Sequence, residues 1–347
     1  MNDTTKPILR ALAGEAVWPP PAWMMRQAGR HLPEYKATRA EAGSFLALAT
    51  TPHLAAEVTL QPVRRYGMDG AILFSDILMV PWALGQKLWM EEGEGPRLEP
   101  IQDMAALSRL DPGRLRGEAQ CIFETVNLTR NALDEAGSRT TLLGFAGSPF
   151  TVACYMIEGR GGSDFAFTRH LAYSDPAFFG KLIRILTDAT VDYLLGQVEA
   201  GAEALMLFDS WSGLLSPSQF RRWVIEPTAN IRRAVAQAAP HIPMIGFPRL
   251  AGSLFGDYAA RTGMQGLAMD THMDPRWAAQ QIPPEMALQG NLDPLALIAG
   301  GVALETEARA LLAAMRGRPY IFNLGHGIEK ETPIEHVMQL MRLVRGG

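Results

Sequence analysis

Short apolar runs recur along the chain, and each one ends abruptly in small or polar residues. Runs without polar alternation are typical of strands that are buried on both faces of a parallel sheet. The stretches between the runs are long enough to hold a crossover helix. We expect eight strands, at residues 22–27, 70–76, 141–147, 204–210, 242–248, 266–271, 286–291 and 320–327.

The intervening segments carry helical patterns. Residues 176–201 and 306–317 are examples, and a glycine closes each of them. Eight strand-helix units predict the α/β class, as a (β/α)8 TIM barrel with extra helices after the second and third strands. No repeat or linker marks a boundary, so we expect one domain over residues 1–347. A doubly wound open sheet is the structural alternative.

Polar residues at the carboxyl ends of the expected strands are candidates for a site, because the active site of a barrel lies at that face. The set is rich in cations and hydrogen-bonding groups, and it has no cluster spaced for a metal. Its members are Arg26, Gln27, Arg30, Ser75, Asp76, Ser148, Asp209, Ser210, Arg249, Asp270, Asn291, Asn323 and His326.

Composition narrows the possible partners. The 347 residues include 32 basic and 36 acidic ones, and the formal charge of −4 gives no positive field for nucleic acid. The N-terminal residues lack the order of a signal peptide, and no run is long enough to span a membrane. Cys121 and Cys154 form no C-x-x-C pair, which argues against a disulfide framework or a thiolate zinc site. These features predict a cytoplasmic protein.

Arg26 and Arg30 lie in M-R-Q-A-G-R, with no carboxylate closer in sequence than Glu15 and Glu34. A guanidinium is costly to leave unpaired in a cleft, so a sheltered pair needs an anionic partner. Gly29 allows a turn, and the arrangement suits a bidentate clamp for carboxylate or phosphate. Carboxylate is favoured because no Gly-rich phosphate loop is present. Exposed charges or structural ion pairs are the alternative.

Asp76 ends the second expected strand. It suits an acceptor for N–H groups or a counter-charge to a cation on a substrate, and nearby arginines would keep it ionised by lowering its pKa. Capping the next helix is the alternative. Tyr155, Ser210 and His326 are candidate polar contacts, for which packing or surface exposure is the alternative.

Taken in order, the motifs resemble those of the uroporphyrinogen decarboxylase family. The resemblance covers essentially the whole chain, and its first segment is highly specific to the family. The segments are P-A-W-M-M-R-Q-A-G-R-H-L-P-E-Y (21–35), F-S-D-I-L (74–78), G-S-P-F-T-V-A-C-Y-M-I-E-G (147–159), L-F-D-S-W-S-G (207–213), Q-G-N-L-D-P (289–294) and N-L-G-H-G (323–327).

The resemblance implies a cofactor-free carboxy-lyase of haem biosynthesis, usually a homodimer. It would remove the four acetate carboxyls of uroporphyrinogen III to give coproporphyrinogen III and four CO2. The eight carboxylates of this substrate would supply the missing anionic partners. Catalytic roles are implied for Asp76, Arg26 and Arg30. The resemblance also implies a set of substrate contacts, namely Arg26, Gln27, Ala28, Gly29, Arg30, Asp76, Tyr155, Ser210 and His326.

Several points stay open at this stage. The proton donor is an arginine, His326 or a bound water. His31 stands where the family usually has Tyr, and Arg249 where Lys is common. One rival is the methyltransferase branch of similar fold, which normally needs a zinc held by Cys and His. The other is a tetrapyrrole carrier that holds the macrocycle without turnover.

Overall fold

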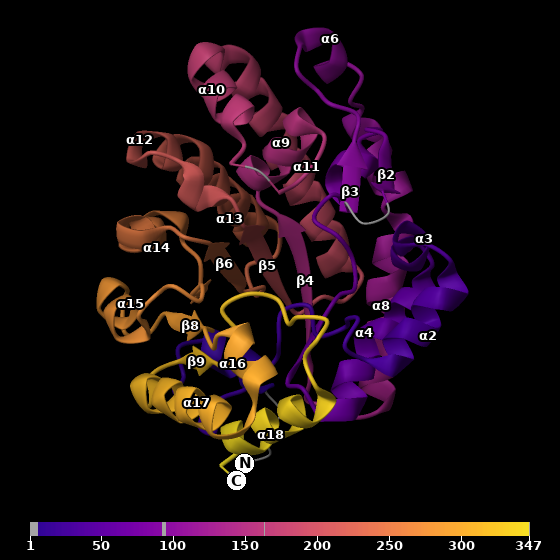
Figure 1. The fold of residues 1–347 in the computed structure, drawn as a ribbon. Coiled ribbons are helices and arrows are strands. Elements are labelled where there is room, and N and C mark those ends of the chain that lie inside the picture. Colours follow the sequence, from indigo (N-terminus) through magenta and orange to yellow (C-terminus); the bar gives the residue numbers. More distant parts are fainter. Residues whose placement is uncertain (1–5, 92–94, 163, 347) are drawn as a thin grey trace.

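The computed structural model describes residues 6–91, 95–162 and 164–346. The expected domain of residues 1–347 therefore includes ten residues outside the described ones, at 1–5, 92–94, 163 and 347. Within the described part, a seven-stranded parallel sheet lies at the centre with helices around it (Figure 1). Its strands are β1 (Gly70–Ile72), β4 (Thr141–Gly147), β5 (Ala204–Asp209), β6 (Met244–Pro248), β7 (Gly266–Ala268), β8 (Ala287–Gln289) and β9 (Tyr320–Ile321).

The strands stand in the sheet in the order in which they occur along the chain, and all neighbours are parallel. A doubly wound sheet would reverse its strand order at a switch point, so that alternative does not describe this protein. Every strand residue of this sheet is buried, as the continuous apolar runs predict. Seven of the eight expected strands are thus confirmed, most of them shorter than expected.

Helices cover the outside of the sheet, and none that the structure describes is long and apolar enough to cross a membrane. Extra elements follow β1 and β4, as predicted, and include the antiparallel hairpin of β2 (Leu88–Glu91) and β3 (Gly95–Leu98). The helices are α1 (Pro7–Leu12), α2 (Pro33–Ala42), α3 (Phe45–Thr50), α4 (Pro52–Tyr66), α5 (Met79–Ala83), α6 (Met104–Leu107), α7 (Leu115–Glu118), α8 (Gln120–Glu135), α9 (Pro149–Glu158), α10 (Ala166–Ser174), α11 (Pro176–Glu199), α12 (Pro217–Phe220), α13 (Glu226–Ala238), α14 (Phe255–Thr262), α15 (Pro275–Gln281), α16 (Pro294–Ala299), α17 (Gly301–Met315) and α18 (Ile334–Val344).

Local sequence signals set the ends of α11. Asp175 caps α11, because its Oδ1 accepts a hydrogen bond from Phe178 N at 3.0 Å, and Pro176 occupies the first turn. Gly201 follows this helix with a φ of 115°, a value that favours glycine. The expected helix over 176–201 is therefore confirmed. The helix expected over 306–317 begins earlier, at Gly301.

Residues 22–27 do not form the expected first strand. Ala22 alone pairs with Phe322, in an isolated parallel bridge. Trp23 N donates to Phe322 O at 3.2 Å, and Asp69 N donates to Ala22 O at 2.8 Å. The segment thus hydrogen-bonds to the chain just after β9 and just before β1, and it turns away immediately afterwards. The apolar run indicated burial correctly, but it did not reveal the turn.

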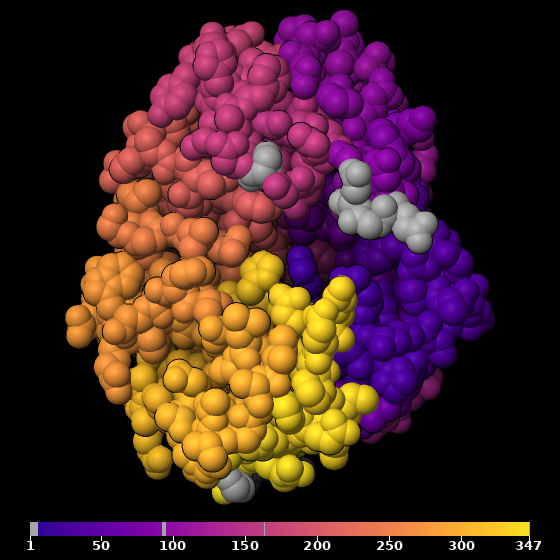
Figure 2. Space-filling view, viewed as in Figure 1, coloured from indigo at the N-terminus to yellow at the C-terminus, as the bar shows by residue number. Residues whose placement is uncertain are grey.

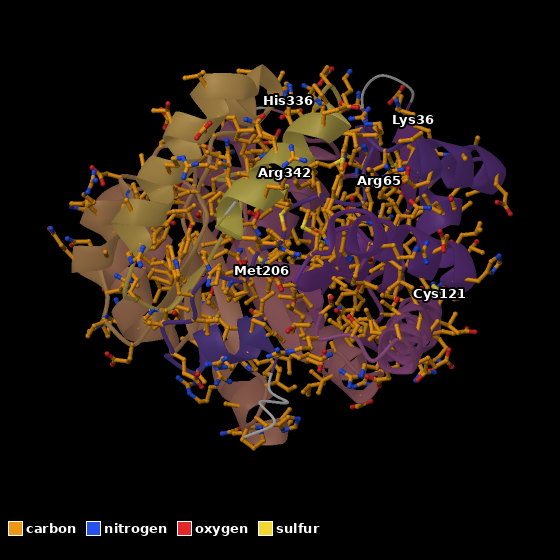
Figure 3. The ribbon with its side chains drawn as sticks, turned by 90° about the horizontal axis from the view of Figure 1, so that it is seen from below. Lys36, Arg65, Cys121, Met206, His336 and Arg342 are labelled. Carbon is orange, nitrogen blue, oxygen red and sulfur yellow. The ribbon has the colours of Figure 1, made fainter. Side chains whose placement is uncertain are left out.

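The interior enclosed by the sheet is filled with side chains. Met206 of β5 lies near the middle of the molecule when it is seen from below (Figure 3). Gln289 Nε2 lies 3.7 Å from the Met206 sulfur, and Gln289 Oε1 accepts from Trp23 Nε1 at 3.0 Å. Because these buried polar groups satisfy one another, the interior is a packed core.

His31 is buried beside Tyr66, with 7% of its surface exposed. The two rings stack with centroids 6.3 Å apart and planes 9° from parallel. Neither ring nitrogen has a hydrogen-bond partner among the described residues. Burial lowers the pKa of His31 to about 4, and the nearby Glu34 acts in the opposite direction.

We expect His31 to make the fold sensitive to acid. The unfolded chain takes up a proton at this residue below about pH 6.5, but the folded protein does so only near pH 4, so stability falls as the pH falls through that interval. The loss is about 2.5 kcal/mol at pH 4.5. His31→Phe should remove it, as measured by urea unfolding at pH 7 and 4.5. The exposed His241→Phe is the control, and equal pH dependence in both variants would refute the expectation.

Candidate active site

Arg26 lies on a turn that a buried amide holds in place. The Gln27 side chain is 1% exposed; its Oε1 accepts from Met24 N at 3.0 Å, and its Nε2 donates to Gly70 O at 2.8 Å. Arg26 itself has a φ of 61°, which is uncommon for a residue other than glycine. The Gln27 amide is therefore occupied within the fold. Substrate contacts from Gln27, and likewise from the half-buried Ala28 and Gly29, stay predictions.

The segment N-L-G-H-G supports the same turn from the end of β9. Asn323 is fully buried, and its Oδ1 accepts from Met25 N at 2.9 Å. Gly327 has no side chain at a point where a Cβ would collide with the Arg26 side chain. A side chain at this position would therefore force the Arg26 side chain to move.

Asp76 lies half-buried after β1, in the region of Arg26. Its Oδ1 accepts from Leu78 N at 2.8 Å, so the local turn before α5 uses one carboxylate oxygen. No residue that the structure describes donates to its Oδ2. Burial raises the pKa of Asp76, against the opposing effects of Leu78 N and Arg26. The expected effect of the arginine is confirmed, and the pKa is nevertheless raised because desolvation outweighs it.

Tyr155 of α9 belongs to the same region. Burial raises its pKa, and the charges of Asp76 and Arg26 act on the hydroxyl in opposite directions. The ring packs against Phe165, with centroids 5.8 Å apart. A tyrosine from α9 therefore lies in the region of a carboxylate that follows β1 and a guanidinium on the turn after residues 22–25.

His326, in the loop that follows the last strand β9, belongs to the same group of residues. Burial, with a further contribution from the positive charges of Arg26 and Arg249, lowers its pKa to about 4. The imidazole is consequently neutral near pH 7, with one N–H donor and one acceptor nitrogen. Ser210 directly follows β5, and its carbonyl oxygen accepts a hydrogen bond from Arg249 Nη1 at 3.5 Å.

Arg30 occupies a different place from Arg26. It lines an open cavity of about 500 Å³ whose walls carry four cations and one carboxylate. Lys330 lies 3.4 Å from that carboxylate, whereas no residue that the structure describes forms an ion pair with Arg30 or Arg26. The ion-pair alternative therefore does not account for either arginine, but both residues are exposed, as the other alternative predicts. The lining residues are Arg30, Tyr35, Lys36, Arg39, Ala40, Gly43, Lys330 and Glu331.

Sequence reasoning missed Lys36 and Arg39, which stand on α2 directly after Arg30. Their spacing of three residues places both on one side of a helix, and this was the available signal. Figure 3 shows Lys36 at the edge of the molecule, far from the central Met206. Figure 2 shows a hollow bordered by the purple N-terminal part, the magenta middle and the yellow C-terminal segment.

Other strand-end candidates point into the fold. Asp209 is buried, accepts from Thr151 Oγ1 at 2.5 Å, and has its pKa raised by burial to about 7. Asn291 is buried as well, and its Nδ2 donates to Asp270 O and Met273 O, both at 2.7 Å. These side chains support the loops at the strand ends and do not face outward.

Comparison with known proteins agrees with the motifs. Residues 3–347 match the family described as uroporphyrinogen decarboxylase (URO-D). The chain belongs to the uroporphyrinogen decarboxylase family. A protein of that name from Granulibacter bethesdensis is 57% identical over 340 residues, covering 98% of this chain and 99% of the relative. Another, from Gluconacetobacter diazotrophicus, is 56% identical over 352 residues and covers 99% of each. The family resemblance is confirmed.

A solved structure described as a methyltransferase from Methanosarcina mazei shares the fold. Its TM-score is 0.76, and the match covers 99% of this chain and 98% of that one at 20% identity. At this identity the likeness concerns the fold alone. Among the residues that the structure describes, no group of three or more His, Cys, Asp or Glu side chains is placed to hold a metal ion.

We expect Gln27→Ala to destabilise the protein by about 2 to 3 kcal/mol, because it leaves Met24 N and Gly70 O without their partner. Urea unfolding at pH 7 measures the change. Gln280→Ala, at an exposed position of α15, is the control. An unfolding free energy equal to that of the control would show that the amide does not hold the turn.

Proposed function

We propose that this chain decarboxylates the four acetate side chains of uroporphyrinogen III, giving coproporphyrinogen III and four CO2 in haem biosynthesis. Family membership over residues 3–347 supports the reaction. The observation that carries the proposal is the convergence of Arg26, Asp76, Tyr155 and His326. Arg26, which has no ion-pair partner among the described residues, acts on the half-buried Asp76 carboxylate, and this pairing suits a ligand with anionic side chains and N–H groups at its centre.

The reaction needs an electron sink, and the pyrrole ring provides one. A proton adds to the ring carbon next to the acetate-bearing position, which makes the ring a cation. The bond to the carboxylate then breaks, CO2 leaves, and its electron pair neutralises the ring. The exocyclic carbon takes a proton to become methyl, and the ring carbon releases the first proton. The net change consumes one proton for each CO2, and no cofactor takes part.

Asp76 is the proposed stabiliser of the ring cation. In this role its free Oδ2 accepts the pyrrole N–H groups, and the ionised carboxylate attracts the positive charge that forms at the ring nitrogen. This attraction is stronger in the transition state than in the neutral ground state, so it accelerates the chemical step. Burial raises the pKa of Asp76 in the free protein, and the incoming N–H donors would favour the ionised form.

The arginines are the proposed carboxylate ligands. Arg26 would bind a carboxylate near the centre of the site. Arg30 would bind one at the edge, in the cavity that it lines with Lys36 and Arg39. His326, neutral because its pKa is about 4, contributes a hydrogen bond. Ser210 and Tyr155 are further polar contacts. The proposed proton donors are an arginine, His326 and a bound water; near pH 7 the neutral imidazole is a poor general acid, and so is an arginine, whose pKa lies far above neutral.

We also propose that residues 1–347 form one (β/α)8 TIM barrel. The hydrogen bonds from Trp23 to Phe322 O and from Asp69 N to Ala22 support its closure by residues 21–23. The homodimer and the cytoplasmic location stay predictions.

Anaerobic incubation of the purified, metal-stripped protein with uroporphyrinogen III tests the activity. After oxidation, chromatography should show porphyrins with seven, six, five and four carboxyls appearing in sequence. Unchanged substrate, from protein that still binds the macrocycle, would indicate a carrier and refute the proposal.

Asp76→Asn should bind coproporphyrinogen III nearly as tightly as the parent and lose most of its turnover, by about 100-fold or more, because an amide cannot stabilise the ring cation by charge. The measurements are CO2 release under saturating substrate and product affinity from tryptophan fluorescence. The exposed Asp188→Asn is the matched control. Turnover near that of the control would rule out charge stabilisation by Asp76.

A further inference from the structure

Arg249 directly follows β6, and the backbone around it is fixed on one side by the end of β5. Its N–H donates to Asp209 O at 3.1 Å and to Phe247 O at 3.0 Å. Its carbonyl accepts from Gly213 N at 3.1 Å and from Ser212 Oγ at 3.0 Å. The backbone polar groups of this residue are thus fully used, and its position in the fold is rigid.

The next residue is held in an unfavourable conformation. Leu250 has a φ of 59°, and its side chain is 41% exposed, so packing does not explain the cost of this backbone. Leu250 N donates at 2.7 Å to Oδ2 of Asp270, which is 3% exposed. Oδ1 of Asp270 accepts from His272 N at 2.9 Å, so the carboxyl group is itself fixed.

Gly213 shows how closely the two loops are packed. A Cβ at this position would collide with Leu250 Cβ and with the Leu250 carbonyl. The loop after β5 can therefore approach only because position 213 carries no side chain. This close contact, together with the hydrogen bond to Asp270, fixes the direction in which the Arg249 side chain leaves the backbone.

The guanidinium itself has almost no protein partner. Arg249 is half-buried, and its one hydrogen bond in the described residues is the 3.5 Å contact with Ser210 O. No described carboxylate forms an ion pair with it. Its charge acts on His326, on which Arg26 also acts. A sheltered guanidinium beside a neutral imidazole and another cation needs an anion from outside the chain.

We propose that Arg249 binds a carboxylate side chain of the tetrapyrrole next to His326, and that Asp270 is a positioning residue that aims Arg249 by holding Leu250. The inference rests on the proposed function and adds a third arginine to it. The ligand class is an acetate or propionate carried by the macrocycle, held by the guanidinium fork with the imidazole N–H as a neighbouring donor.

Substitutions at position 249 test the contact. Arg249→Met should raise KM for uroporphyrinogen III, and Kd for coproporphyrinogen III, by about 10- to 100-fold, the effect of losing a charged hydrogen-bonding partner. Arg249→Lys keeps the charge but loses the fork, so its increase should be smaller. Arg276→Met, at an exposed position, is the control. KM and Kd of Arg249→Met within twofold of the control would overturn the proposal.

A second readout does not depend on turnover. The charge of Arg249 lowers the pKa of His326, so Arg249→Met should shift the imidazole titration upward in NMR spectra of the free protein, whereas Arg249→Lys should keep it low. If the protein fails the decarboxylation assay but the His326 titration still shifts upward in Arg249→Met, the proposed function is refuted and the placement of Arg249 beside His326 is supported. An unchanged titration in Arg249→Met would refute the geometry.

A mutant cycle tests the role of Asp270. Asp270→Ala should raise KM in the parent, because Leu250 is released, and it should add little in the Arg249→Met background. Leu250→Gly should restore part of the KM of Asp270→Ala, since glycine adopts a positive φ without help. Equal effects of Asp270→Ala in both backgrounds would show that Asp270 only stabilises the fold, and would overturn the positioning role.

Discussion

The position of Arg26 depends on how residues 21–27 satisfy their backbone groups between the two edges of the sheet. Ala22 and Trp23 pair with the chain beside β9 and β1, and the Gln27 amide then closes a turn between Met24 and Gly70. Buried backbone groups must find partners, so this segment has little freedom to move. The guanidinium leaves from the tip of that turn, and its place relative to Asp76 follows from the fold.

Charge at the site is a local property and does not follow the net charge of the chain, which is −4. Many surface cations have carboxylate partners, such as Arg65 with Glu34 at 2.6 Å. Arg26, Arg30 and Arg249 have none among the described residues. The fold thereby keeps these guanidinium groups available, and two of them, Arg26 and Arg249, add to the effect of burial that keeps His326 neutral.

Sequence patterns predicted buried segments better than they predicted side-chain directions. Seven apolar runs form strands in the expected order, because continuous burial leaves a clear pattern. The run at 22–27 has the same pattern, yet it turns, because the Gln27 side chain replaces the partner strand. Asp209 and Gln27 are buried although the sequence placed both among the strand-end candidates. Lys36 and Arg39 were missed because they lie on a helix and not at a strand end.

In the proposed reaction, Asp76 and the arginines must act at different distances from the reacting ring. A guanidinium next to the ring nitrogen would oppose the cation that forms there, whereas one at a peripheral carboxylate only holds the substrate. Desolvation raises the pKa of Asp76 while the site is empty, and pyrrole N–H donors would lower it again. The same hydrogen bonds would therefore bind the substrate and favour the ionised carboxylate that stabilises its transition state.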